Sequence, residues 1–360
     1  MKSKQASLIG ASVAVLFANA ASAQSQVSIY GIADACFSRS DTGATTTNRL
    51  NSGCQSGSRL GFRGSEDLGG GNSATFVLEN GFNIDDGSLG QGGRMFGRKA
   101  TVGLSSRTLG TIEMGRDYAP TFYALSPVDP TAFGIGTLSN TMWTGSNPTT
   151  VARNDNAVNY ISPALGPVTL RAQYSLGEQA APAAKGGRNT FGFNAIYRSG
   201  AWLASVAYAT HANAADTAND KATTGGLSYT SGALTLSGAV QAGRWEGSRT
   251  SATPSSASSI FSRDYRSFMV GGSYFLQPTV KLWVSLKRYD DRTANNFDAN
   301  QLTVATSYAL SRRTDLYAAY SRLKNASSSS YAISDATTAY GAVAPGASPS
   351  LFAVGMRHAF

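Results

Sequence analysis

Alternation of apolar and polar residues is the feature that most limits how this chain can fold. In VKLWVSLK at 280–287, the even-numbered residues are aliphatic and the odd-numbered ones are mostly polar; the segments 168–174 and 301–308 repeat the pattern. A period of two places each class of side chain on its own face of a β-strand. Several such segments end in a tyrosine, where we expect an aromatic girdle at the membrane surface: Tyr174, Tyr289, Tyr308 and Tyr320.

The connections between these segments alternate in length. We expect short turns at 67–72, 106–110, 163–167, 199–201, 231–233, 276–279 and 311–314. We expect longer polar loops near 41–55, 84–93, 119–152, 177–188, 211–221, 246–263, 291–298 and 324–348. Seven turns and eight loops separate sixteen strands, and short turns at one end with long loops at the other are typical of outer-membrane barrels. We therefore predict an all-β fold, a 16-stranded antiparallel transmembrane β-barrel.

The composition agrees with a barrel that faces lipid outside and water inside. Charged residues make up 14% of the chain, whereas a soluble domain has about 25%. Past the N-terminal region, every apolar stretch is interrupted too soon to cross a bilayer as a helix.

The N-terminus has the pattern of a secretory signal peptide. Lys2 and Lys4 precede an apolar run at 8–18, and Ala21-Ser22-Ala23 supplies the small residues of a cleavage site. We expect residues 1–23 to be removed, which leaves 24–360 as the barrel.

The C-terminal segment predicts how the barrel closes. Its apolar residues share one parity and end on an aromatic residue: Phe352, Val354, Met356 and Phe360. We expect this last strand to pair with the first strand, near 27–37, so that no sheet edge stays open in lipid. Phe360 is then the expected signal for the barrel-assembly machinery.

Charge and histidine content exclude several other classes of function. The formal charge is +9, but the chain has no run of Lys and Arg and no basic helix, so we expect no nucleic-acid partner. Only two histidines occur, His211 and His358, and neither has a second ligand or a nucleophile at useful spacing. We therefore expect no metal, no cofactor and no enzyme active site.

The two cysteines, Cys36 and Cys54, lie 18 positions apart across the first predicted hairpin. An oxidising compartment allows them to pair, and the closed loop would then contribute roughly 3 kcal/mol. The spacing alone leaves both the paired and the free state open.

Several blocks of the sequence resemble one family. They are VSIYGIADA at 27–35, SRLGFRGSEDLGGG at 58–71, GRKATVGLSS at 97–106, GTIEMGRDYAP at 110–120, RNDNAVNYISP at 153–163 and the terminal GMRHAF. Together they are similar to the trimeric general-diffusion porins of β-proteobacteria such as Neisseria, Bordetella and Comamonas. The resemblance implies a homotrimer in the outer membrane, surrounded by lipid, that passes small hydrophilic solutes and ions. It also implies a third loop folded inward to narrow the pore.

The segment 119–152 is that third loop by resemblance, and its composition supports an inward position. Its many apolar residues favour burial: Phe122, Tyr123, Phe133, Ile135, Leu138, Met142 and Trp143. It contains no Lys or Arg, and we expect Asp129, its one acidic residue, to lie at the pore constriction.

The wall opposite this loop is expected to be basic. Arg59 shares the lumen parity of its strand, while Arg98 and Arg153 each stand at the start of a strand; by resemblance these three form the arginine cluster of the constriction. Glu79 has lumen parity as well and is expected to neutralise part of their charge. Guanidinium groups stay charged at all relevant pH values, and a narrow pore focuses their field, so we expect a preference for anions.

Alternatives stay open for several of these residues. The arginines can instead be structural, pairing with carboxylates and backbone carbonyls that hold the loop, and the two roles are compatible. A channel specific for an organic or inorganic anion is the second functional hypothesis. Asp85 and Asp86 are either a divalent-cation site or solvated loop acids, and the Arg116–Asp117 pair is expected to be structural.

Overall fold

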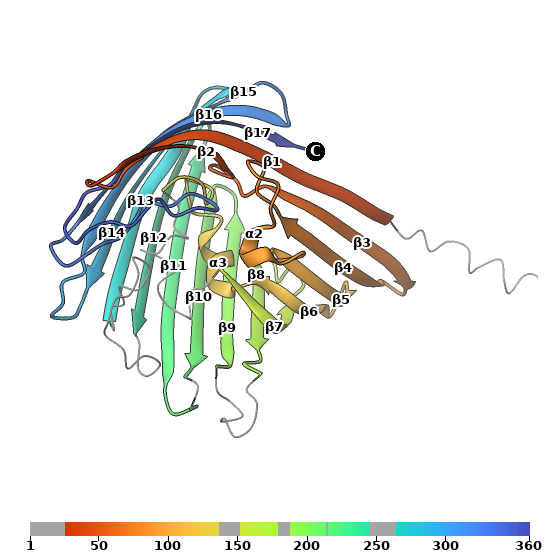
Figure 1. Ribbon diagram of the computed structural model, residues 1–360. Helices are drawn as coiled ribbons and strands as arrows, with labels where there is room; N and C mark the ends of the chain where they lie inside the picture. Colours follow the sequence, from red (N-terminus) through yellow and green to blue (C-terminus); the bar gives the residue numbers. More distant parts are fainter. Residues whose placement is uncertain (1–25, 137–151, 179–187, 214, 245–263) are drawn as a thin grey trace, which may run out of the picture.

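The chain folds into one closed antiparallel barrel in a computed structural model that describes residues 26–136, 152–178, 188–213, 215–244 and 264–360 (Figure 1). The predicted signal peptide lies outside these residues. The strands of the first half are β1 (Gln26–Asp41), β2 (Thr46–Ser52), β3 (Arg59–Gly69), β4 (Asn72–Gly81), β5 (Lys99–Ser106), β6 (Gly110–Tyr118), β7 (Arg153–Ile161) and β8 (Val168–Ser175). Two short helices, α2 (Gly90–Gly93) and α3 (Pro120–Leu125), lie in the loops before β5 and β7.

The second half of the barrel is a continuous meander of antiparallel strands. It consists of β9 (Thr190–Ser199), β10 (Trp202–Ala212), β11 (Asn219–Ser231), β12 (Leu234–Arg244), β13 (Asp264–Gln277), β14 (Val280–Asp291), β15 (Ala299–Ala309), β16 (Thr314–Asn325) and β17 (Ser350–Ala359). Within the described residues, no helix is long and apolar enough to serve as a membrane span.

Seventeen labelled strands occupy sixteen positions, because β2 and β3 share one. The C-terminal half of β1 pairs with β2, from Ala35 opposite Ser52 to Asp41 opposite Thr46. The N-terminal half of β1, Gln26–Ile32, pairs with β3. The predicted sixteen-stranded barrel is confirmed. The expected long loop at 41–55 is wrong, because the mostly polar residues Thr46–Ser52 form strand β2 within it and the interruption falls at 53–58 instead.

The alternation read from the sequence sorts side chains between lipid and lumen. In β14, Leu282, Val284 and Leu286 are exposed on the outer surface, while Trp283 and Ser285 are buried on the inner side. Tyr174, Tyr308 and Tyr320 are exposed as expected for a girdle. Tyr289 does not join them: it has the inward parity of β14, is 2% exposed and stacks on Tyr265 with ring centroids 5.1 Å apart.

Closure depends on the first and last strands, as predicted. β1 pairs with β17 from Ile32 opposite Ala359 to Asp41 opposite Ser350, and the two strands lie side by side in Figure 1. Gly31 and Phe360 exchange two backbone hydrogen bonds of 3.1 Å, which complete the ladder. A Cβ added at Gly31 would collide with the ring of Phe360 and with the carbonyl oxygen of Arg59. Glycine at 31 is therefore required by close packing at the closure point.

In the described part of the chain, segments of two loops fold into the barrel. In L3, the loop at 119–152, helix α3 packs against β9, β10 and β11, and Figure 1 shows it inside the barrel. In L8, the loop at 326–349, Tyr331, Ile333 and Tyr340 are buried against the inner wall. The two loops meet where the Gly136 N–H donates to the carbonyl oxygen of Ser334, 3.0 Å away.

A disulfide lies beneath L8. It joins Cys36 of β1 to Cys54 in the interruption between β2 and β3, with Cα atoms 6.1 Å apart. Both residues are buried, and the Tyr340 hydroxyl lies 3.5 Å from the Cys54 sulfur. The bridge fixes the interruption against the wall at the level where L8 is docked.

Replacing Gly31 with alanine is expected to weaken closure of the barrel. Because the added methyl overpacks the site, we expect a loss of about 1–3 kcal/mol in the free energy of unfolding. Denaturant unfolding in lipid vesicles measures it. Gly225→Ala is the matched control, since Gly225 also lies on a strand and its nearest neighbour to a new Cβ is 3.6 Å away. Equal stability of the two variants would contradict the proposed crowding.

Candidate pore constriction

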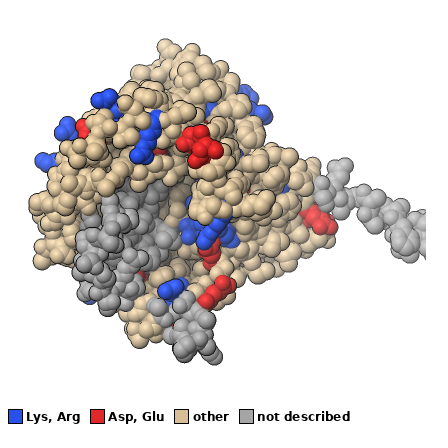
Figure 2. Space-filling model, in the orientation of Figure 1, with Lys and Arg blue, Asp and Glu red and all other residues tan. Residues whose placement is uncertain are grey.

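A cavity of about 600 Å³ inside the barrel brings together most of the predicted site residues. The side chains of Arg59, Arg98, Arg153 and Glu79 all line it, opposite residues of L3 and the 334–339 segment of L8. In Figure 2, Lys and Arg side chains gather near the middle of the visible face, with acidic side chains beside them. The cavity lies between the inward loop and the basic wall that the sequence predicts.

Strand register explains why these residues meet. Arg59 begins β3 opposite Gly81 of β4, and Glu79 lies two residues away with the same parity. Arg98 directly precedes β5, whose first residue pairs with Glu79. Arg153 begins β7 opposite Tyr118 of β6. Neighbouring strands therefore deliver the four side chains at one level of the barrel.

Arg98 and Glu79 form a buried ion pair. Arg98 Nε donates to Glu79 Oε1 at 2.7 Å, and the side chains are 7% and 10% exposed. The Tyr30 hydroxyl donates to the other carboxylate oxygen at 2.9 Å, and Arg98 Nη2 donates to the Tyr118 hydroxyl at 2.8 Å. Glu79 therefore neutralises Arg98, as the sequence predicts.

Arg153 and Arg59 are held by groups that do not cancel their charge. Arg153 donates to the Tyr118 hydroxyl at 2.6 Å and to the backbone carbonyl of Arg98 at 2.8 Å, and its guanidinium lies 4.2 Å from the centre of the Tyr118 ring. Arg59 Nε donates to the carbonyl of Gly57 at 2.9 Å. In the described part of the chain, no carboxylate pairs with either guanidinium. The wall keeps an excess of positive charge.

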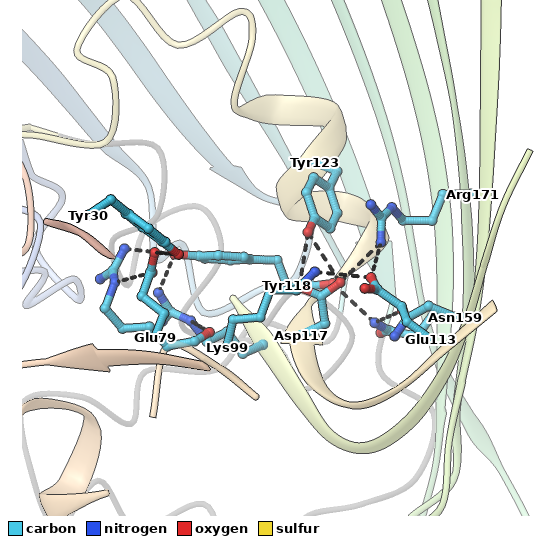
Figure 3. A network of polar contacts seen from close by, with 12 residues as sticks. Tyr30, Glu79, Lys99, Glu113, Asp117, Tyr118, Tyr123, Asn159 and Arg171 are labelled. Carbon is cyan, nitrogen blue, oxygen red and sulfur yellow. Dashed lines mark hydrogen bonds and ion pairs between the residues drawn. The ribbon is translucent and has the colours of Figure 1, made fainter. Parts of the chain in front are cut away.

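A second polar cluster anchors L3 and is balanced in charge. Lys99 Nζ lies 3.0 Å from Glu113 and 3.2 Å from Asp117, and Arg171 lies 3.0 Å from Asp117. The Tyr123 hydroxyl, at the end of α3, donates to Asp117 at 3.0 Å, and Figure 3 shows that side chain reaching down from the helix toward Asp117. Asp117 is fully buried, so the cluster fixes the root of the loop.

Sequence reasoning missed most of this cluster, although a signal was present. Arg171 has the inward parity of its strand, between Thr169 and Gln173, and Lys99 and Glu113 face the lumen side of β5 and β6.

Arg116 makes contacts of the structural kind that the sequence predicts. Its guanidinium donates hydrogen bonds to Asp155 and, at 2.7 Å, to the backbone carbonyl of Gly97.

Asp129 does not line the cavity. Its carboxylate instead accepts hydrogen bonds from the N–H and hydroxyl of Thr131, at 2.9 and 2.8 Å, and from the Phe133 N–H at 3.3 Å. These bonds hold a tight turn of L3, so the residue shapes the loop.

Of the apolar residues predicted to draw L3 inward, Leu138, Met142 and Trp143 lie outside the described residues.

The cavity side of L3 presents a stack of aromatic rings. Tyr118 stacks on Phe122 and Phe122 on Phe133, each pair with centroids 4.3 Å apart. Arg153 covers the Tyr118 end of the stack. All four residues line the cavity, which therefore has an apolar side and a cationic side.

L8 contributes a buried carboxyl group to the same cavity. Asp335 accepts hydrogen bonds from the Tyr340 hydroxyl and from the N–H groups of Thr337 and Thr338. Burial raises the pKa of Asp335 to about 6, against these hydrogen bonds, which favour the ionised form. The group is thus ionised at neutral pH and protonated in mild acid.

Acidic residues of the second loop show no metal-binding arrangement. Asp86 accepts hydrogen bonds from the N–H and hydroxyl of Ser88, which lower its pKa, and its side chain is solvent-exposed. Among the described residues, no group of three or more His, Cys, Asp or Glu side chains is placed to hold a metal ion.

A closed sixteen-stranded barrel with an inward loop and a charged constriction defines a water-filled channel of the outer-membrane porin class. A family model described as Gram-negative porin matches residues 10–328. An outer membrane porin protein 32 of Delftia acidovorans is 32% identical over 367 aligned positions, which cover 97% of this chain and 98% of that protein. An outer membrane porin of Bordetella pertussis is 31% identical over 299 positions, which cover 79% of this chain and 69% of that one.

Solved structures give the same result. An anion-selective porin from Comamonas acidovorans superposes with a TM-score of 0.79 at 29% identity, over 94% of this chain and 100% of that one. OmpF of Salmonella typhi, at 14% identity over 93% of this chain and 97% of that one, has a TM-score of 0.70 and shares the fold. The chain belongs to the Gram-negative porin family. It is an outer-membrane protein that forms a diffusion channel.

The protonation of Asp335 should be visible in ion selectivity. Its pKa is raised, so the site gains a negative charge as pH rises through about 6 and loses that charge below it. We expect the ratio of chloride to potassium permeability, measured by reversal potential in planar bilayers, to increase between pH 7.5 and pH 5. In Asp335→Asn that increase should be smaller than in the wild type, and an equal pH response in the variant would contradict the assignment.

Proposed function

We propose that this porin is a general-diffusion channel with a preference for anions, set by Arg59 and Arg153. The observation that carries the proposal is the pair of guanidinium groups in the constriction with no carboxylate partner in the described part of the chain, next to an Arg98 that Glu79 neutralises. A unit charge about 10 Å from a passing ion changes its energy by roughly 0.4 kcal/mol in water and 1.7 kcal/mol at an effective dielectric constant of 20. Because an anion and a cation respond in opposite directions, the energy that sets their permeability ratio changes by twice this amount, roughly 0.8–3.3 kcal/mol, so removing one arginine is expected to change the ratio at least about fourfold.

Arg59 and Arg153 can hold neighbouring segments in place and also set the ion selectivity. Arg153 ties the start of β7 to the carbonyl of Arg98, and Arg59 ties β3 to Gly57. These bonds use backbone and hydroxyl acceptors, which position the guanidinium groups and leave their charge in place. The name of the Comamonas relative, an anion-selective porin, supports the same preference.

The remaining features of the proposal follow from the family. We infer a homotrimer, a signal peptide at 1–23, lipid around the barrel and recognition of Phe360 by the barrel-assembly machinery. We propose a purely conducting role, without enzymatic activity, in which inorganic ions and small hydrophilic solutes cross the constriction.

Removing one cation from the constriction is expected to weaken anion preference. In a tenfold potassium chloride gradient, Arg153→Gln and Arg59→Gln should each lower the chloride-to-potassium permeability ratio at least about fourfold. Arg312→Gln, which removes a charge from an exposed periplasmic turn, is the control and should leave the ratio unchanged. An unchanged reversal potential in both constriction variants would argue for a structural role alone.

The aromatic stack favours a second candidate, a channel that binds organic anions with a flat apolar body. The edges of aromatic rings carry the positive part of the ring quadrupole, and here three stacked rings adjoin the guanidinium groups. A carboxylate could face Arg153 while its hydrocarbon part lies along Phe122 and Phe133. Such a site would saturate, whereas simple diffusion stays proportional to concentration.

Benzoate separates the two candidates. If the stack is a binding site, benzoate current should saturate with concentration, acetate current should not, and Phe122→Ala should remove the saturation. Linear currents for both anions in the wild-type channel would leave general diffusion as the function.

A further inference from the structure

The outer surface of the barrel carries basic residues where lipid is expected. On β13–β16, strand register places outward side chains in rows. One row runs Phe268, Arg288, Asn300 and Lys324; the next, toward the membrane centre, runs Val270, Leu286, Leu302 and Arg322. The row after that contains Val284, Val304 and Tyr320. Three cations thus stand at the edge of an apolar band.

These rows border a groove on the outer surface. The groove has a volume of about 660 Å³ and is lined by the cations Arg288, Arg322 and Lys324 and by the apolar side chains of Phe268, Val270, Leu286 and Leu302. Ser348 of L8 lines it as well. It therefore opens at the end of the barrel that carries the long loops, which faces the outer leaflet in an outer-membrane barrel.

Two of the three cations are not neutralised by the protein. Arg288 lies 3.7 Å from Asp290 and 3.4 Å from Asp298, although its side chain is still 54% exposed. Among the residues that the structure describes, no carboxylate pairs with Arg322 or Lys324. Arg322 is the more unusual of these two cations for a lipid-facing position, because it lies in the apolar row, directly opposite Leu302.

A cation on the lipid-facing surface needs an anionic partner. Arg and Lys on that face destabilise a barrel increasingly with depth, and basic side chains at the membrane surface attract anionic headgroups. Phosphate suits both residues, as a bidentate partner for a guanidinium and a point-charge partner for an ammonium. Leu302 and Leu286, which share the row of Arg322, suit an acyl chain.

We propose that this groove is a binding site for a phosphorylated glycolipid of the outer leaflet, with chemistry of the lipid A type. A headgroup phosphate lies between Arg322 and Lys324, with Arg288 beside it, and an acyl chain passes over the row of Leu302 and Leu286 toward the row of Val304 and Val284. The site lies outside the lumen and is separate from the constriction.

Retained lipid A is the direct measurement. Purified porin is incubated in detergent with diphosphoryl lipid A, passed through a sizing column, and the lipid per chain is counted by mass spectrometry. We expect R322Q/K324Q to bind at least tenfold more weakly than the wild type, with K324Q alone in between. The control R312Q/R313Q removes the same charge from the other end of β16 and should bind as the wild type does.

Two comparisons can overturn the proposal. Equal retention by R322Q/K324Q and the wild type contradicts it, and so does equal retention of lipid A from which both phosphates have been removed. If the face instead joins copies of this chain, R322Q/K324Q will change the oligomeric state in the absence of lipid A. Because the residues lie outside the pore, single-channel conductance of R322Q/K324Q should match the wild type, which checks that the barrel has folded.

Discussion

A barrel in hydrocarbon must pair every backbone amide and carbonyl within itself, and the rest of this structure depends on that requirement. The ladder is completed where β17 returns to β1, down to the two bonds between Gly31 and Phe360. Closure fixes which residues face the lumen, because one residue of slip would reverse the parity of a whole strand. The register that closes the barrel is thus also the register that brings Arg59, Glu79 and Arg153 to one level.

Two groups of charges inside the barrel, among the described residues, have different consequences. Lys99 and Arg171 meet Glu113 and Asp117 in a balanced cluster, which holds α3 through Tyr123. A buried charge left without its partner is strongly destabilising, so balance suits an anchor. Arg59 and Arg153 instead face the cavity and are held by hydroxyl, ring and carbonyl groups. The inner surface of the barrel therefore carries both a charge-balanced cluster that anchors L3 and guanidinium groups whose positive charge acts on ions in the cavity.

The parity of residues along the strands makes much of the fold and of the constriction predictable from the sequence. The features that could not be predicted depend on contacts between residues far apart in the chain or within a folded loop. Alternation and loop length gave the strand number, the closure by Phe360 and the lumen position of Arg59 and Glu79. Parity also places Tyr289 inside the barrel, because it has the same parity as the inward-facing Ser285 and Lys287 of β14. The position of Asp129 in L3 could not be predicted from the sequence. It depends on a turn that is held by hydrogen bonds to the Asp129 carboxylate itself. The strand β2 was missed because its residues are as polar as those of a loop, and only pairing with β1 makes them a strand.

The central claim is that uncompensated guanidinium groups make the constriction a place where anions concentrate. Anomalous scattering from crystals grown in rubidium bromide tests it most directly, since both ions are visible in one experiment. We expect bromide between Arg59, Arg98 and Arg153, and no rubidium in that cavity. Rubidium in the cavity, with bromide found only in bulk solvent, would contradict it.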